Sequence, residues 1–311
     1  WATEFCAMLW RLLSFTHLWI ALGAFVTTMF SWMWWAEGAA MERGGVEVAF
    51  WVATATGLGY TVQRAIKHTR HPHNMPVGRR RFWDGAKWPM VGAWSLAWAG
   101  STWVHRGELG LGESGRAAVL GAVALASLAY AVVPGWGGGL RKSVWMKTPL
   151  IAAVWATATT HHPELGWDGV LWVQRFVFIA GLTLPFDIRD LDVDKDHMDT
   201  LPLVKSPKLV LSWSRRLLAS AGILSLAVWG WRLGQHGVRP IDAAPMLLAL
   251  QCGWAMWLIR PKVALDALMS SDEWTRERKT GWQLDGVLVM PYVVALTLHA
   301  LLLVLAPVMR G

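Results

Sequence analysis

The sequence predicts an all-α integral membrane protein with about nine transmembrane helices. Of its 311 residues, 54% are hydrophobic and only 16% are charged, whereas a soluble domain carries about 25% charged residues. Long runs almost free of charge recur along the chain, and most approach the roughly 17–25 residues that cross a bilayer core. We therefore expect a single transmembrane domain over residues 1–311. The net charge of +8 then reflects membrane orientation rather than nucleic-acid binding.

The apolar runs are bounded by charged, Gly-rich or Pro-rich loops, which set their approximate ends. Most of the 29 Lys and Arg residues lie in the loops after the second, fourth, sixth and eighth runs, so these loops are expected in the cytoplasm. An odd number of spans then leaves the N-terminus in the cytoplasm and the C-terminus on the opposite side of a membrane, expected to be a bacterial inner membrane. The predicted spans are residues 12–35, 48–63, 88–104, 117–133, 144–160, 170–186, 217–231, 243–259 and 287–308.

Tryptophan is unusually frequent, with 24 residues. Many of them, including Trp88, Trp103, Trp145 and Trp231, fall at the ends of predicted spans, where Trp commonly lies at the membrane–water interface. The alternative is that some Trp side chains point inward and line a cavity for an apolar ligand. Both alternatives stay open because the sequence does not give the rotation of each helix.

The sixth predicted span runs directly into an aspartate-rich stretch at residues 184–196. If the helix continues beyond its apolar run, Asp187, Asp190 and Asp194 lie on one face. Clustered carboxylates repel one another, so this face favours a cation, either a divalent metal or basic side chains. The alternative interpretation is a solvated acidic helix end whose charges pair with nearby Arg and Lys.

Basic residues around this stretch suit a phosphate ligand. Magnesium held by a few carboxylates completes its shell with water and substrate phosphate, and Arg189 and Lys195 would neutralise the remaining phosphate oxygens. Arg141 and Lys147, on either side of the start of the fifth span, could also reach phosphate or could simply anchor this part of the chain at the membrane surface. Asp285 opens the last apolar run as an interfacial residue or as an ion partner facing a cavity.

The sequence Asp187-Ile188-Arg189-Asp190, followed by Asp194 and Lys195, resembles the second aspartate-rich motif of the UbiA superfamily of intramembrane prenyltransferases. The resemblance extends loosely over the whole chain, since that fold has nine transmembrane helices around a central cavity. It implies magnesium ions on a prenyl diphosphate, ionisation of the allylic group and alkylation of an acceptor.

The first aspartate-rich motif of that family is missing. It should end the second span, but the chain has no acidic residue between Glu47 and Asp84 and carries Arg64 and Lys67 there. These two cations could replace a magnesium ion and clamp a diphosphate. Alternatively, they could pair with the aspartates as a structural network that leaves no metal and no catalysis.

Two functions are therefore weighed. The first is a UbiA-like prenyltransferase that uses Mg²⁺ and transfers a prenyl group from a polyprenyl diphosphate to a lipophilic acceptor within membrane lipid. The alternative is a catalytically degenerate UbiA-like scaffold that binds a lipid, quinone or pigment, or joins other membrane subunits. For the first, the catalytic and metal-binding residues are Asp187, Asp190 and Asp194, and the substrate-binding residues are Arg189, Lys195, Arg64, Lys67, Arg141 and Lys147.

Overall fold

The structure is a computed structural model. It describes residues 2–35, 45–70, 72, 75, 77–107, 109, 118–119, 121–126, 144–161, 166, 168–191, 200–236, 243–291, 293–294 and 297. The regular elements of this part of the chain are all helices.

The long helices of the bundle are α1 (Ala2–Phe15), α2 (Leu18–Trp35), α3 (Gly45–Arg70), α4 (Val77–Val104), α6 (Lys147–Thr160), α7 (Gly169–Arg189), α10 (Pro207–His236) and α11 (Ala243–Leu258). Shorter elements are α9 (Leu201–Val204), α12 (Pro261–Leu268), α13 (Glu273–Glu277) and a π-helix, η4 (Arg278–Leu284).

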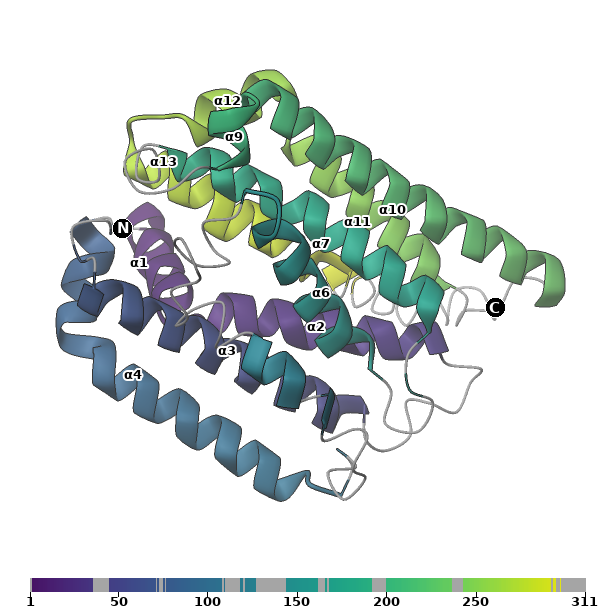
Figure 1. The fold of residues 1–311 in the computed structure, drawn as a ribbon, viewed down its shortest axis with the longest axis horizontal. Coiled ribbons are helices and arrows are strands. Elements are labelled where there is room, and N and C mark those ends of the chain that lie inside the picture. Colours follow the sequence, from purple (N-terminus) through teal and green to yellow (C-terminus); the bar gives the residue numbers. More distant parts are fainter. Residues whose placement is uncertain are drawn as a thin grey trace, which may run out of the picture.

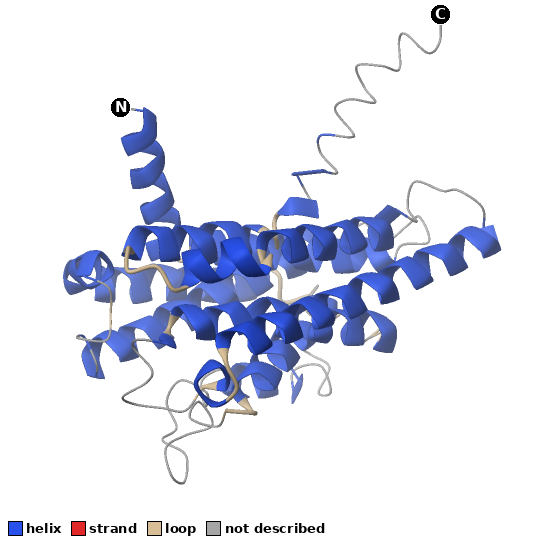
Figure 2. Ribbon diagram, turned by 90° about the horizontal axis from the view of Figure 1, so that it is seen from above, coloured by secondary structure: helices blue, strands red, loops and turns tan. Residues whose placement is uncertain are grey.

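The helices form two groups that meet at α2. In one group α3 lies between α2 and α4, and in the other α7 packs on α6 and α10 while α10 also packs on α11. Helix α2 joins the groups because it contacts both α6 and α11. The short helices α9, α12 and α13 gather at one end of the bundle (Figure 1). Figure 2 shows α1 rising away from the layers of long helices.

The predicted spans agree with the helices through the middle of the chain but are too short at their ends. The second, third and seventh spans lie inside helices α3, α4 and α10, which extend further. The fifth, sixth and eighth spans match α6, α7 and α11 within a few residues. Much of the fourth and ninth spans lies outside the described residues, so the count of nine stays a prediction.

Two described helices, α7 and α10, are long and apolar enough to cross a membrane. The bent pair of α1 and α2 would make a third if it is one span, and α11 is a shorter apolar helix. The described Trp residues at predicted span ends are strongly exposed in several cases, including Trp88 and Trp103 at 72% and 71%. Such exposure fits an interfacial position.

The predicted first span, residues 12–35, is broken rather than continuous. The two helices on either side of the break are bent by 68°, and His17 between them has a φ of 63°. This left-handed conformation is unfavourable for a residue with a Cβ and is held by long-range contacts. His17 Nδ1 lies 3.0 Å from Thr61 Oγ1, and Trp94 Nε1 donates to the Thr16 carbonyl at 2.9 Å.

Small residues let the helices approach closely, as in other membrane bundles. A Cβ atom at Gly57 of α3 would lie 2.3 Å from the Trp94 ring of α4. Between α7 and α10, a Cβ atom at Gly181 would lie 2.9 Å from the Leu218 side chain, and Ser214 Oγ donates to the Gly181 carbonyl at 2.6 Å. These contacts fix the spacing of the helices whose ends carry the charged residues described next.

Candidate functional site

The end of α7 carries the first aspartates of the predicted motif. The helix starts where the Asp168 side chain accepts a hydrogen bond from the Leu171 N–H at 2.7 Å, and it continues past its apolar run to Arg189. The helix therefore continues beyond Phe186 as far as Arg189, whereas Asp194 lies outside the described residues, so the shared face of Asp187, Asp190 and Asp194 stays a prediction. Asp187 lies in its last turn, and Asp190 caps it through a backbone N–H that donates to the Phe186 carbonyl at 3.1 Å.

Asp187 is buried, with only 4% of its surface exposed. Its Oδ1 accepts a hydrogen bond from Lys147 Nζ at 2.5 Å, and Lys147 is the first residue of α6. The two helices pack along their length, so this ion pair lies at the end of a long apolar contact. A buried carboxylate needs such a partner because its desolvation is costly.

Asp190 forms a bidentate ion pair, with two hydrogen bonds, with its neighbour in the chain, Arg189. Arg189 Nε and Nη2 donate to the two carboxylate oxygens at 2.6 and 2.9 Å. The same guanidinium donates from Nη1 to Thr280 Oγ1 of η4 at 3.1 Å and lies over the Phe186 ring at 5.2 Å. Arg189 therefore links the end of α7 to η4.

The electrostatics of Asp190 favour its charged form. Burial raises its pKa, but the charge and hydrogen bonds of Arg189, with the charges of Lys67 and Lys147, more than offset this and leave the pKa well below its usual range. Lys147 thus acts on both Asp187 and Asp190. Lys67, from the last turn of α3, also lies near enough to stabilise the Asp190 carboxylate.

A third ion pair, also deeply buried, closes the same end of the bundle. Arg79 Nη2 of α4 donates to Glu277 Oε2 of α13 at 2.7 Å, and both side chains are about nine-tenths buried. The Arg79 guanidinium also lies 5.3 Å from the centre of the Phe15 ring at the end of α1. Arg64 of α3 interacts electrostatically with this pair and with Arg189 and Asp190. The charged groups therefore form one connected cluster.

The structure brings together most of the site residues predicted from the sequence. Asp187, Asp190, Arg189, Lys147, Arg64 and Lys67 all belong to this cluster. Within the described part of the chain, Asp187 pairs with Lys147 and Asp190 pairs with Arg189, and Arg64 forms no ion pair with either aspartate. Three further predicted residues, Asp194, Lys195 and Arg141, lie outside the described residues.

Three members of the cluster were not predicted. Arg79 belongs to a run of three arginines in the basic loop after the second predicted span, and Glu277 and Thr280 come from the loop before the last predicted span. Isolated Arg and Glu residues 198 positions apart give no local pattern that pairs them. Asp285, for which the sequence left two roles open, interacts electrostatically with Arg189, Glu277 and Arg79.

The described carboxylates at the end of α7 could supply only part of a magnesium site. Within the described ranges, no group of three or more His, Cys, Asp or Glu side chains is arranged to hold a metal ion. Asp187 and Asp190 nevertheless supply two carboxylates, and proteins commonly bind Mg²⁺ through one or two carboxylates together with water and substrate phosphate. The oxygen donors fit that ion, although both carboxylates now have cationic partners.

The fold is similar to solved structures of a UbiA homologue from Archaeoglobus fulgidus. One has a TM-score of 0.58 at 13% sequence identity, covering 91% of this chain and 98% of that chain. The same homologue bound to DMAPP and Mg²⁺ has a TM-score of 0.55 at 13% identity, covering 91% and 99%. Bound to GPP and Mg²⁺, it has a TM-score of 0.53 at 12% identity, covering 90% and 98%.

No protein-family model and no curated protein sequence matches this chain. The structural similarity covers about nine-tenths of the chain. At 12–13% sequence identity, it is evidence for the fold alone. The predicted resemblance is confirmed at that level: the chain has the all-α membrane-bundle fold of these UbiA homologues.

Proposed function

We propose that this chain is a membrane prenyltransferase that transfers a prenyl group from a polyprenyl diphosphate to a lipophilic acceptor. The observation that carries the proposal is the charged cluster at the end of α7, where Asp187 and Asp190 meet cations from α3, α6 and α7. The UbiA homologue with the same fold binds DMAPP or GPP together with Mg²⁺, which supports a diphosphate and a metal as the occupants of this cluster.

In this proposal Asp187, Asp190 and Asp194 hold Mg²⁺. When bound, the ion would neutralise the negative charge that develops on the leaving diphosphate. The carboxylates are suited to this role because Asp190 stays ionised and the buried Asp187 lies at the end of the apolar contact between α6 and α7.

Arg189 and Lys147 would exchange partners when substrate binds. Both now neutralise the aspartates, and with a metal held by those aspartates Arg189 and Lys147 would turn their N–H groups toward phosphate oxygens. Arginine can bind phosphate with two parallel hydrogen bonds, and lysine acts as a compact point charge. Arg64 and Lys67 from α3 would add further positive charge, with Arg141 and Lys195 completing the proposed set.

The proposed chemistry breaks the C–O bond between the allylic carbon and the diphosphate, and the electron pair leaves with the diphosphate. The cationic side chains stabilise that departing charge. The acceptor then forms a bond to the allylic carbon and loses a proton. Apolar helix walls beside the cluster would shield the allylic cation from water.

We further propose that the charged end of the bundle faces the cytoplasm and that the chain forms one transmembrane domain. The cluster and the short helices share this end with Phe15 at the end of α1, which supports a cytoplasmic N-terminus. The proposal also places the C-terminus on the other side of a bacterial inner membrane.

The test is a radiolabelled prenyl-diphosphate assay on purified full-length protein with Mg²⁺ and a panel of lipophilic acceptors. We expect product from the wild type and a loss of at least about a hundredfold in Asp190→Ala, since electrostatic groups of an active site contribute on this scale. Asp266→Ala, which removes an exposed carboxylate from α12, is the matched control and should retain activity. Product formation that survives Asp190→Ala would refute the metal role.

One observation favours a second candidate function. Both described aspartates already have cationic partners, Lys147 and Arg189, and a closed ion-pair network needs neither metal nor substrate. The chain would then be a scaffold that binds a lipid, quinone or pigment, or a subunit of a larger membrane complex. Mass spectrometry of an organic extract of the purified protein tests this: a stoichiometric quinone or pigment, without prenyl transfer to any acceptor, would favour the scaffold.

A further inference from the structure

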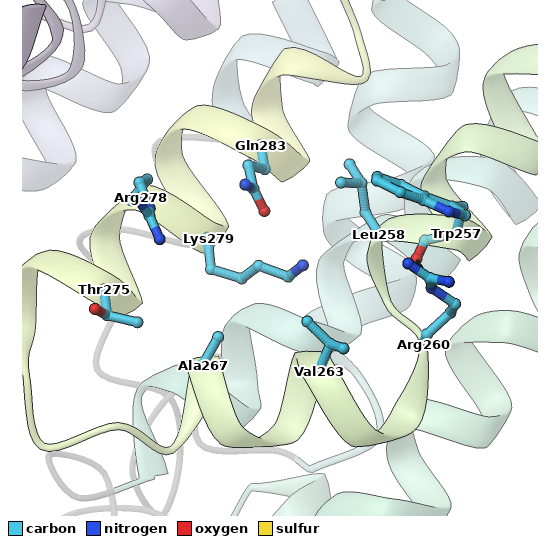
Figure 3. Close-up of a pocket in the computed structure, with 9 residues that line it drawn as sticks. All are labelled: Trp257, Leu258, Arg260, Val263, Ala267, Thr275, Arg278, Lys279 and Gln283. Carbon is cyan, nitrogen blue, oxygen red and sulfur yellow. Dashed lines mark hydrogen bonds between the residues drawn. The ribbon is translucent and has the colours of Figure 1, made fainter.

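A second basic site lies near the cluster, on another face of η4. It is a pocket of about 180 Å³ between the end of α11, α12, α13 and η4. Three cationic residues line it: Arg260, Arg278 and Lys279. Figure 3 shows the Lys279 side chain extending from η4 into the space beside α12, between the other two cations.

Lys279 is unusually buried for a lysine, with 6% of its surface exposed. Burial lowers the pKa of its ammonium, and the positive charges of Arg260 and Arg278 lower it further. Among the described residues, no carboxylate forms an ion pair with any of these three cations. A buried cation held between two others is costly unless an anion enters the space they share.

The walls of the pocket are apolar on the side of α11 and α12. Arg260 is held at the pocket edge because its Nε donates to the Trp257 carbonyl at 3.1 Å and its guanidinium lies 4.7 Å from the Trp257 ring centre. Trp257 and Val263 line the pocket and are themselves at least half exposed. The site therefore combines one buried cation, Lys279, with two exposed cations, Arg260 and Arg278, and an apolar, exposed border.

The pocket is separate from the charged cluster at the end of α7. Thr280 of η4 accepts a hydrogen bond from Arg189 of the cluster, whereas the adjacent Lys279 reaches into the space beside α12 (Figure 3). Neither Asp187 nor Asp190 lines the pocket. An inference about this pocket consequently does not depend on the proposed prenyl transfer.

We propose that this pocket binds a phosphate group through Lys279, Arg278 and Arg260. Lysine and arginine side chains together provide the charge and the multiple N–H donors that a phosphate needs. Basic pockets beside membrane helices characteristically accept anionic headgroups, and an apolar border accommodates acyl chains. The same N–H donors would also hold a soluble phosphate, so the phosphate has two possible sources.

The experiment titrates the purified full-length protein in neutral detergent with three probes: short-chain phosphatidylglycerol, short-chain phosphatidylcholine and inorganic phosphate. The readouts are the melting temperature and the number of retained lipids in native mass spectrometry. We expect saturable binding of an anionic probe to the wild type, about tenfold weaker in Arg278→Gln and in Lys279→Gln, since one charge-assisted hydrogen bond contributes on this scale.

Arg278 is exposed, so Arg278→Gln keeps the test valid even where Lys279→Gln unfolds. Lys208→Gln is the matched control because Lys208 is an exposed cation at the start of α10. Binding of phosphatidylglycerol alone assigns a lipid headgroup, and binding of inorganic phosphate as well assigns the phosphate group itself. Binding that is absent, that is equal in wild type and pocket variants, or that falls as much in Lys208→Gln would overturn the proposal.

Discussion

Two ion pairs at the same end of the bundle differ in burial and in the distance they span along the chain. Arg79 and Glu277 are 198 positions apart, and their side chains are 9% and 10% exposed. Arg189 and Asp190 are neighbours in the chain, and their side chains are 17% and 34% exposed. The first pair ties α4 to α13, whereas the second lies at the rim of the cluster.

This difference in burial predicts different roles for the two pairs, one in stability and the other in ligand binding. A deeply buried pair is costly to break, because removal of one partner leaves an uncompensated charge away from water. A pair between adjacent, partly exposed residues contributes little to stability, because water and salt screen it. We therefore expect the Arg79–Glu277 pair to hold the fold and the Arg189–Asp190 pair to be available to a ligand.

The largest effect is expected from Arg79→Met. It leaves Glu277 buried without its partner, which should lower the free energy of unfolding by about 3–5 kcal/mol. Thermal or denaturant unfolding of the purified protein in detergent measures this. The double variant Arg79→Met/Glu277→Met should recover much of the loss, since an apolar pair can replace a buried ion pair. A double variant no more stable than the single one would contradict a structural role for the pair.

An intermediate effect is expected from Gly57→Ala, which tests the α3–α4 contact that brings Arg64 near Arg79. The new Cβ would meet the Trp94 ring at 2.3 Å, and the hydrogen bond of Trp94 to the Thr16 carbonyl restrains that ring. Overpacking of this kind costs about 1–3 kcal/mol. Unfolding measurements check it against Gly59→Ala, where a Cβ meets no heavy atom within 4 Å. Equal stability of the two variants would contradict the close contact.

The smallest effect on stability is expected from Asp190→Asn. Loss of the partly exposed pair should change the free energy of unfolding by less than about 1 kcal/mol, while Mg²⁺-dependent prenyl transfer is lost. Parallel unfolding and activity measurements separate the two effects. If Asp190→Asn destabilises the protein as much as Arg79→Met, then both pairs are structural and the distinction between them fails.

The fold and part of the cluster could be predicted because their signals are local. The apolar run of α7 and the aspartates that follow it are contiguous, so the sequence alone indicates a helix that ends in carboxylates. The basic residues of the predicted loops also showed which cations could pair with these carboxylates. The missing first motif was equally plain, because no acidic residue lies between Glu47 and Asp84.

What could not be predicted depends on contacts between distant segments. The break at His17 is held by the hydrogen bond between His17 and Thr61 and by the one from Trp94 to the Thr16 carbonyl. The apolar run around His17 contains no local signal that predicts it. The choice of Lys147 as the partner of Asp187 depends on how α6 and α7 pack. Trp83, which is fully buried, and Trp88, which is largely exposed, lie five positions apart on α4 and look alike in sequence.

The π-helical form of η4 has a consequence for how this protein tolerates insertions and deletions. A π-helical turn holds one more residue than an α-helical turn, and each residue of an α-helix rotates the chain by about 100°. Deleting one residue from Arg278–Leu284 would let this segment relax to an α-helix, because its wider turns already hold the residue that is removed. We therefore expect η4 to tolerate a one-residue deletion with little change in the direction of Asp285, whereas a deletion inside α7 or α10 would turn every later side chain of that helix by about 100°.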